Sequence, residues 1–464
     1  MTIPTDSMSL SPEIINWVEE TIRGQVVSRE RRPGGGRREA WYIDVEVDGE
    51  TLPLFLRYDR ATPEEKGDPF TLHREARIFA ALADSAVPIP RTVGVHPTEQ
   101  AILSTRVPGY PWFSRMQSED ERVSVATDFM QILAAMHQID PRLLKLDDQH
   151  ADMDLRELVD LEINIWEKIY RDVEAPADPL IEVALEWVRK NRPDIDGPVV
   201  IVQGDTGPGN FLYQDGKVTA VLDLEMGHLG DPHDDLAWVS LRAVQEPFTN
   251  FADRLQDYAA LVPWTVETDR IRYYRVLAEL RVVILGHRST SNPDLLSEVG
   301  NSLIYGLLHR RLLTEALSDV LGIPLPDISI PEPKPGPMDW LYGAALEQIR
   351  QIIVPRSEDP FVIQRSKGLA RILKVLQQFE HHNGNLEELD LAELNEILGT
   401  TYTSSHEASS ELCRRVRAGQ LSEITVVSAL ARSVGRRAEM LRSASGVLAD
   451  RHFDPLPADL PAAK

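Results

Sequence analysis

Alternating apolar and polar positions near the start of the chain predict a small antiparallel sheet. Over 39–47 the apolar side chains alternate with more polar neighbours, which is the pattern of a half-buried strand. An Asp-Gly pair at 48–49 favours a hairpin turn, and 51–57 then places three leucines on one face of a second strand. Because Pro53 cannot donate to a ladder, it predicts an edge position for that strand. A third apolar stretch covers 101–107.

Helical periodicity dominates most of the remaining chain. The segment 71–84 carries apolar side chains at helical spacing, and Glu75 falls in the middle of that stripe. A buried acid requires a cation, so a basic partner is expected for Glu75. From 123 onward the pattern is mainly helical, interrupted within 199–224 by two apolar runs that enclose a polar loop and a second Asp-Gly turn. The interruption predicts a small hairpin set among helices.

The order of these elements predicts an α+β protein built from several units. A length of 464 residues suggests about three globular units at roughly 150 residues each. The pattern divides into a small β-rich N-terminal lobe over 1–107 and a larger helical lobe over 108–321. Prolines recur too often over 322–338 for a helix or a central strand, which predicts a linker. A separate all-helical module over 339–446 and a flexible tail over 447–464 complete the prediction.

Composition and charge narrow the classes of partner. With 42% hydrophobic and 26% charged residues, the chain is typical of globular proteins, and its net charge of −24 disfavours a nucleic-acid surface or a polybasic membrane anchor. Cys413 is the only cysteine, which excludes an intrachain disulfide and a cysteine-based metal centre. The start of the chain lacks a signal-peptide pattern, and no apolar stretch approaches the length of a bilayer span. We therefore expect a cytoplasmic protein.

The segment 199–238 carries the residues that are best suited to chemistry. Asp205 precedes Asn210 by five residues, and Asp223 follows Asn210 by thirteen. In phosphoryl transfer, one acid orients the hydroxyl that attacks, while an amide oxygen and a second carboxylate hold Mg²⁺ on the nucleotide phosphates. Taken singly, these residues equally suit turn capping and loop hydrogen bonds, and only their joint occurrence favours catalysis.

This segment resembles the aminoglycoside phosphotransferase and choline kinase superfamily, whose loop reads H-G-D-x-x-x-x-N before a metal-binding aspartate. Its ending, VLDLEMGHLGDPHDDLAW, is similar to the branch of phosphotransferase domains associated with acyl-CoA dehydrogenases. The resemblance covers about 20–320 and implies a bilobal, protein-kinase-like fold with ATP and Mg²⁺ as cofactors. It assigns the catalytic base to Asp205, the metal ligands to Asn210 and Asp223, and a supporting acidic role to Glu225.

The nucleotide contacts also follow from the resemblance. Arg57 stands in the second strand, where many kinases place a lysine that contacts phosphates and pairs with a helix glutamate, here Glu75. Alternatively, Arg57 is a solvated residue of an edge strand and Glu75 is paired with another cation. The glycine triplet before the first strand suits either a loop over the phosphates or a surface turn. The predicted nucleotide-binding residues are Gly34, Gly35, Gly36, Arg57, Glu75, Thr105 and Val107.

Several alternatives remain open from the sequence. Gln203 stands where the superfamily usually has histidine, which leaves room for a nucleotide-binding pseudokinase that recruits a partner through its C-terminal helices. His228, His233 and the neighbouring aspartates suggest a metallohydrolase, but they lack the His-x-x-x-His spacing of a helical metal site. The resemblance favours a hydroxyacyl-CoA or hydroxy acid as the acceptor, with an aminoglycoside-like compound second. Self-association or a partner protein is also left open for the helical module.

Overall fold

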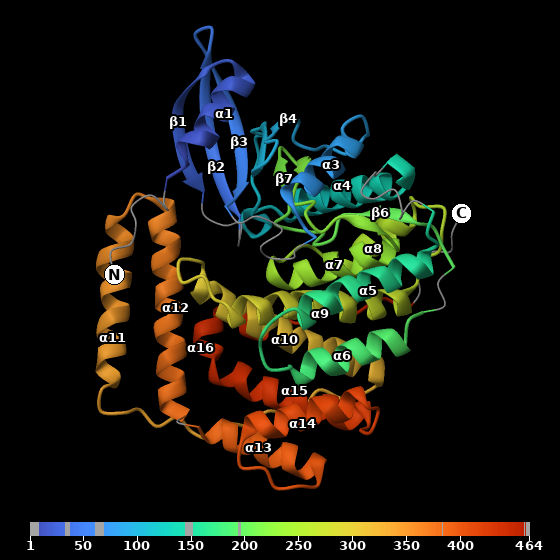
Figure 1. The fold of residues 1–464 in the computed structure, drawn as a ribbon, viewed down its shortest axis with the longest axis vertical. Helices are drawn as coiled ribbons and strands as arrows, with labels where there is room; N and C mark the ends of the chain where they lie inside the picture. Colours follow the sequence, from blue (N-terminus) through green and yellow to red (C-terminus); the bar gives the residue numbers. More distant parts are fainter. Residues whose placement is uncertain are drawn as a thin grey trace.

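The computed structural model describes residues 9–32, 38–60, 69–143, 152–193, 196–382, 384–458 and 460 (Figure 1). Its N-terminal lobe is a five-stranded antiparallel sheet of order β1-β2-β3-β5-β4. The strands are β1 (Gln25–Arg32), β2 (Glu39–Val47), β3 (Glu50–Asp59), β4 (Thr92–Val95) and β5 (Gln100–Thr105). Helix α1 (Pro12–Ile22) shares a core with the buried face of the sheet, while α3 (Leu72–Leu82) packs on Ile102, on the opposite face.

The predicted strands and turn of this lobe are present, but β3 is not an edge strand. It pairs with β2 on one side and with β5 on the other. Pro53 is tolerated because it lies one residue beyond Leu54, the last β3 residue opposite β5. The proline therefore marks the end of one ladder rather than the edge of the sheet. The edges are formed instead by β1 and β4, neither of which the hydrophobic pattern predicted.

The helical lobe lies below the sheet in Figure 1. Its helices are α4 (Glu119–His137), α5 (Leu155–Arg171), α6 (Pro179–Lys190), α7 (Pro232–Gln245), α8 (Phe251–Ala259), α9 (Thr268–Ser291) and α10 (Val299–Leu321), with short 3-10 turns at Phe113–Arg115 and Pro141–Leu143. Two small antiparallel sheets lie among them: the hairpin of β7 (Phe211–Gln214) and β8 (Lys217–Val221), and the pair of β6 (Val200–Val202) and β9 (His228–Gly230), which encloses that hairpin in the chain. The Asp-Gly turn at 215–216 joins β7 to β8 as expected, with φ of 52° and 75°.

The C-terminal region is helical, as predicted, and continues the core of the helical lobe. It comprises α11 (Asp339–Gln348), a π-turn (Ile349–Ile353), 3-10 turns at Val354–Arg356 and Gly446–Asp450, α12 (Pro360–His382), α13 (Asn385–Leu398), α14 (Ser405–Arg417), α15 (Glu423–Met440) and α16 (Arg442–Ser445). Helix α14 packs on α6 and α15 on α10, and their buried residues belong to the same cluster as those of the lobe. The region therefore does not have a separate core. The predicted boundaries of the units stay a prediction.

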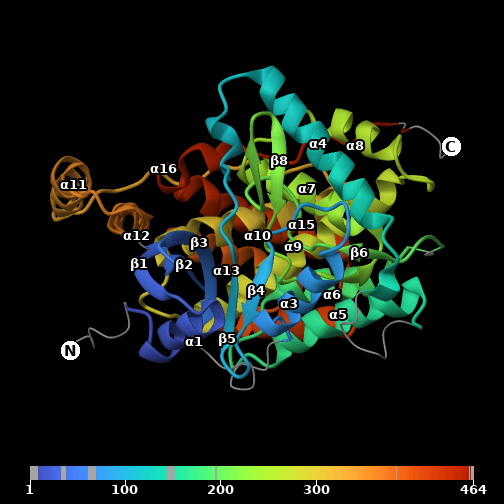
Figure 2. The same ribbon diagram turned by 90° about the horizontal axis from the view of Figure 1, so that it is seen from above.

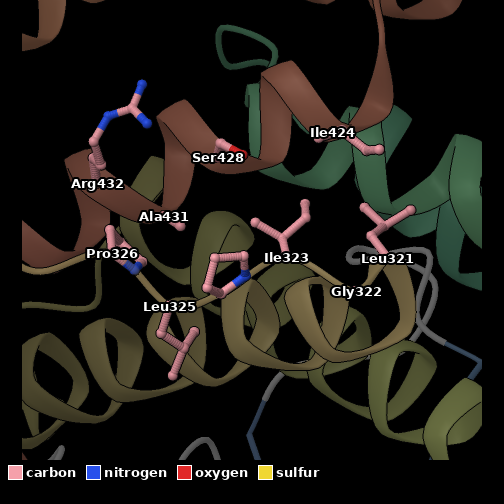
Figure 3. Close-up of a pocket in the computed structure, with 10 residues that line it drawn as sticks. Leu321, Gly322, Ile323, Leu325, Pro326, Ile424, Ser428, Ala431 and Arg432 are labelled. Atoms are coloured by element: carbon pink, nitrogen blue, oxygen red, sulfur yellow. The ribbon is translucent and has the colours of Figure 1, made fainter.

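The proline-rich segment after α10 has neither helix nor strand over 323–336, and its residues are exposed or half-buried. Its first residues and helix α15 border a groove of about 430 Å³, shown in Figure 3. None of the residues predicted for catalysis or nucleotide binding lines this groove. Within the described part of the chain, no helix combines the length and apolar character needed to cross a membrane.

Candidate active site

The loop between β6 and β7 closes on itself through Asn210. The side-chain amide of Asn210 donates to the Asp205 carbonyl at 2.7 Å and to its carboxylate Oδ2 at 2.8 Å. Asp205 adopts φ 66°, and Gly204 and Gly207 before and after it also have positive φ. Such φ values are unfavourable for a residue with a Cβ, so Asp205 is held in a strained conformation by its surroundings. The five-residue spacing thus brings these two side chains into direct contact.

Asp235, at the start of helix α7, holds this loop in place through hydrogen bonds. Its carboxylate accepts hydrogen bonds from the backbone amides of Gln203 at 2.8 Å and Gly204 at 3.0 Å, and from the Thr206 hydroxyl. His137 also contacts it at 2.9 Å, and the Asp235 side chain is fully buried. A buried carboxylate that accepts several hydrogen bonds makes a rigid support. The side chain of Gln203, which replaces the usual histidine, donates to the Leu222 carbonyl at 2.8 Å.

Arg242, also on helix α7, is a site residue that sequence reasoning missed. Its Nε donates to the Pro208 carbonyl at 3.1 Å, its Nη1 lies 3.4 Å from Asp205 Oδ1, and its Nη2 donates to Asn210 Oδ1 at 3.3 Å. A Cβ on Gly207 would lie 2.8 Å from the Arg242 Cβ, so this glycine allows the close approach. The sequence contained only a weak signal for this role, because Arg242 is a single arginine seven residues after Asp235.

The second acidic pair lies after β8 and faces Arg57 of β3. Asp223 has φ 58°, and its Oδ1 lies 3.3 Å from Arg57 Nη2, while Glu225 Oε2 lies 3.1 Å from the same nitrogen. Arg57 Nη1 contacts Glu75 Oε1 at 2.5 Å, which is the pair predicted from the buried helix acid. Glu75 also accepts from the backbone amide of Leu224 at 3.2 Å. One arginine thus connects the sheet, helix α3 and the segment after β8.

Arg38 is a second cation that the sequence did not single out. Its Nη1 donates to Glu225 and lies 3.6 Å from Glu75 Oε2, and its Nη2 donates to the Phe70 carbonyl. The side chain is 3% exposed, so it contributes a buried positive charge to the cluster. The sequence did contain a signal for a second cation. Glu75, Asp223 and Glu225 carry three negative charges, and Arg57 neutralises only one of them.

The surroundings of Asp205 and Glu75 raise the pKa of both carboxyl groups. Burial raises the pKa of Asp205 to about 6; Asp223 adds to the rise, and Arg242 opposes it. Burial likewise raises the pKa of Glu75, against the attraction of Arg57 and Arg38. For Arg57, burial opposes the charge, but the carboxylates of Glu75, Asp223 and Glu225 outweigh it and raise the pKa. Asp205 therefore remains largely ionised at neutral pH and is more basic than an ordinary aspartate.

The remaining predicted residues are placed as follows. Thr105 ends β5, where its hydroxyl accepts from the Arg91 amide at 3.1 Å, and Val107 follows it outside any strand. No hydrogen bond or ion pair joins either of them to the acidic cluster among the described residues. Gly34, Gly35 and Gly36 lie outside the described residues. The six residues that the fold brings together are Asp205, Asn210, Asp223, Glu225, Arg57 and Glu75.

The donor set fits a divalent cation that arrives with phosphate rather than a resident metal. In the described part of the chain, no group of three or more His, Cys, Asp or Glu side chains is arranged to hold an ion by itself. Asn210 offers an amide oxygen, and the carboxylates of Asp223 and Glu225 are about one third exposed. Mg²⁺ is typically bound by one or two carboxylates together with substrate phosphates and water.

The histidines and aspartates around α7 form internal pairs. Asp231 caps the helix through the amide of His233 at 2.9 Å, and its carboxylate lies 3.4 Å from Arg270. Asp234 pairs with Arg281 at 2.8 Å and lies 3.3 Å from His228. The contacts with Arg270 and Arg281 tie α7 to α9, and the contact with His228 ties it to β9.

Comparison with known proteins gives one family and several distant relatives. The family described as Phosphotransferase enzyme family matches residues 31–276, more than half of the chain. Acyl-CoA dehydrogenase family member 10 of Mus musculus is 28% identical over 181 residues, which are 37% of this chain and 16% of that protein. Aminoglycoside 3'-phosphotransferase of Enterococcus faecalis is 22% identical over 243 residues, 50% of this chain and 86% of that protein.

Among solved structures, the macrolide 2'-phosphotransferase of Brachybacterium faecium is 20% identical, with 61% of this chain and 99% of that one covered and a TM-score of 0.44. The aligned part spans only 16% of the length of each of the first two curated relatives, acyl-CoA dehydrogenase family members 10 and 11 of Mus musculus.

Proposed function

Because this chain belongs to the Phosphotransferase enzyme family, we propose that it is a kinase of small-molecule hydroxyl groups, with ATP as its phosphoryl donor and Asp205 as its catalytic base. The observation that carries this proposal is the convergence of three elements. The loop after β6 supplies Asp205 and Asn210, the segment after β8 supplies Asp223, and β3 supplies Arg57. Phosphoryl transfer relies on positioning and charge stabilisation, which a rigid cluster of this kind provides.

In the proposed reaction, the acceptor hydroxyl oxygen attacks the terminal phosphorus of ATP. A new P–O bond forms, the bond to the bridging oxygen breaks, and ADP leaves with that oxygen. The hydroxyl proton passes to the Asp205 carboxylate and from there to solvent. The raised pKa of Asp205, about 6, makes it a better acceptor than an ordinary aspartate while leaving it mostly ionised at pH 7.

The surrounding residues hold this base and the phosphates in place. Asn210 and Arg242 orient the Asp205 carboxylate through contacts of 2.8 and 3.4 Å. Arg57 is fixed by the buried Glu75, and its second nitrogen lies beside the carboxylates of Asp223 and Glu225, from where it would contact phosphate. Asn210, Asp223 and Glu225 would hold Mg²⁺, which supplies positive charge to the phosphate oxygens when bound. Thr105 and Val107 would contact the adenine, and Gly34, Gly35 and Gly36 would cover the phosphates.

We propose a hydroxyacyl-CoA or a related hydroxy acid as the acceptor. Two observations support this class. One is the motif VLDLEMGHLGDPHDDLAW, which covers 221–238, and the other is the match to relatives named acyl-CoA dehydrogenase family members. An aminoglycoside-like compound is the second candidate, supported by the match to 86% of the Enterococcus faecalis enzyme and by a net charge of −24, which suits a cationic acceptor.

The test is a pooled reaction with MgATP and a library of hydroxyacyl-CoAs, hydroxy acids and aminoglycosides, followed by mass spectrometry for a phosphate-sized gain. Asp205→Asn is the control, because asparagine tolerates the positive φ of this position. A product formed only by the wild type supports the proposal and identifies the acceptor class. Transfer that survives in Asp205→Asn would contradict the role of Asp205. ATP binding without any product would favour the pseudokinase.

A further inference from the structure

Helices α11 and α12 form an arm that leaves the body of the molecule. In both ribbon views α11 lies at the outside, with α12 between it and the helical lobe (Figures 1 and 2). The two helices are antiparallel neighbours, because Asp339 at the start of α11 accepts hydrogen bonds from Gln377 at 2.6 Å and His381 at 2.7 Å near the end of α12. The arm comprises residues 339–382.

Helix α12 is fixed to the body along one face. Gly368 approaches α10 so closely that a Cβ on Gly300 would meet its carbonyl oxygen, and Arg371 donates to Asn301. Val375 is buried on the same side, and Phe361 lies under the Arg31 guanidinium of β1 at 5.1 Å. The arm is therefore anchored to both lobes rather than being a loose extension.

An adjacent face of α12 exposes an apolar stripe with the spacing of a helix–helix seam. Val362, Leu369 and Leu376 recur every seven residues and are 41%, 48% and 51% exposed. Phe379, at 39% exposure, lies on the anchored side instead, under the Arg437 guanidinium of α15 at 5.9 Å. Since each residue advances a helix by about 100°, this stripe lies about 100° away from the anchored position of Gly368. A seven-residue apolar repeat is the pattern that packs against another helix.

Helix α11 has no buried residue, although its sequence is apolar. Trp340 and Leu341 at its beginning are 65% and 43% exposed, and Ile352 and Ile353 just beyond its end are 47% and 43% exposed. A helix with this composition ordinarily lies in a core. Large apolar side chains that gather exposed on one element mark an interaction site.

The charge of the arm indicates which partner fits. Residues 339–382 contain five acidic and six basic side chains, a formal net charge of +1, whereas the whole chain carries −24, so the remainder carries −25. In two copies of the chain, the parts outside the arm repel each other, because each carries a charge of −25. The arm is nearly neutral and extends away from the rest of the chain, so two copies can associate through it with less repulsion. A two-helix face about 30 Å long and about 20 Å wide offers roughly 600 Å² in projection, on the order of the 800 Å² that each partner buries in a standard interface.

From the seam, the exposed α11 and this charge contrast, we propose that two copies of the chain associate through their α11–α12 arms as a four-helix bundle. The association is isologous, so each arm covers the apolar stripe of the other. Phe361 and Arg31 then connect the bundle to strand β1, which makes the paired arms a support for the N-terminal lobe. The inference is independent of the phosphoryl acceptor and of Asp205.

Sedimentation velocity of the full chain, from about 0.1 to about 100 µM, tests the proposal. The wild type is expected to sediment as a dimer of 104.4 kDa, twice 52.2 kDa, at the upper concentrations. Leu369→Glu and Trp340→Glu should each weaken dimerisation by about 100-fold or more, because two-fold symmetry places two carboxylates in every interface. Leu295→Glu is the matched control, since Leu295 is 83% exposed, lies outside the arm and should leave the dimer intact.

Circular dichroism and thermal unfolding of the variants separate loss of association from loss of folding. If Leu369→Glu unfolds, Trp340→Glu carries the test, because Trp340 is 65% exposed and its helix has no buried residue. A wild type that stays at 52.2 kDa up to about 100 µM would overturn the proposal and leave the arm to a different protein. A dimer that neither arm variant weakens, or that Leu295→Glu weakens equally, would also overturn it.

Discussion

Replacing the Asp205 carboxylate by an amide should abolish phosphoryl transfer and stabilise the fold. The side chain is 25% exposed, and burial raises its pKa from the ordinary 3.8 to about 6. The folded state therefore favours the neutral form, which Asp205→Asn imitates at every pH. Asparagine also accepts φ 66° more readily than most residues, so the substitution adds no backbone strain.

The expected stabilisation depends on pH with a definite sign. Because the folded pKa is above the unfolded one, the contribution of Asp205 to stability is complete below about pH 4 and is lost as the pH rises through about 6. For pKa values of 3.8 and about 6, the loss in the wild type is on the order of 1–2 kcal/mol at pH 5 and about 3 kcal/mol at pH 8. Asp205→Asn does not incur this loss, so its advantage over the wild type should grow between these two pH values.

Urea unfolding of both proteins at intervals from pH 5 to pH 8 measures this difference. Asp140→Asn is the control, because Arg142 lowers the pKa of Asp140, so the pKa shift has the opposite sign to that of Asp205. This substitution should not raise the free energy of unfolding at pH 8. A wild type and Asp205→Asn of equal stability at pH 8, or a gap that shrinks as the pH rises, would refute the reasoning. Retained transfer by Asp205→Asn would separately refute its catalytic role.

Three further substitutions test the supports of the site. Arg57→Met leaves the fully buried Glu75 without its nearest cation and should lower the free energy of unfolding by about 3 kcal/mol in urea titrations; adding Glu75→Gln should restore at least half of it. Gly207→Ala should lower kcat by about 100-fold in an ATP-consumption assay, because φ is 139° and the new Cβ would meet a side chain of α7 at 2.8 Å. Gly286→Ala, where no atom lies within 4 Å, should leave kcat unchanged. Asp235→Asn removes an acceptor shared by two amides and a hydroxyl, so thermal and urea unfolding should show a loss of about 3 kcal/mol.

The sequence by itself determined the features that depend on neighbours along the chain. Both Asp-Gly pairs form the predicted turns, because 48–49 and 215–216 place a small polar residue and a glycine where φ must be positive. Glu75 is buried with a cation, as its place in an apolar stripe required. Asp205 and Asn210 contact each other because the four residues between them, two of which are glycines, form a tight loop.

Only the tertiary structure decided which distant groups meet. Arg38 reaches Glu225 across 187 residues of chain, and Arg242 closes on the Asp205 loop because helix α7 passes beneath it. The position of β3 inside the sheet and the packing of α14 and α15 on the helical lobe also follow from long-range contacts. Local periodicity sets which face of a helix or strand is apolar, but many faces of a chain are apolar in the same way. The choice among them is made by the shape and charge of the surfaces that the folded chain brings together.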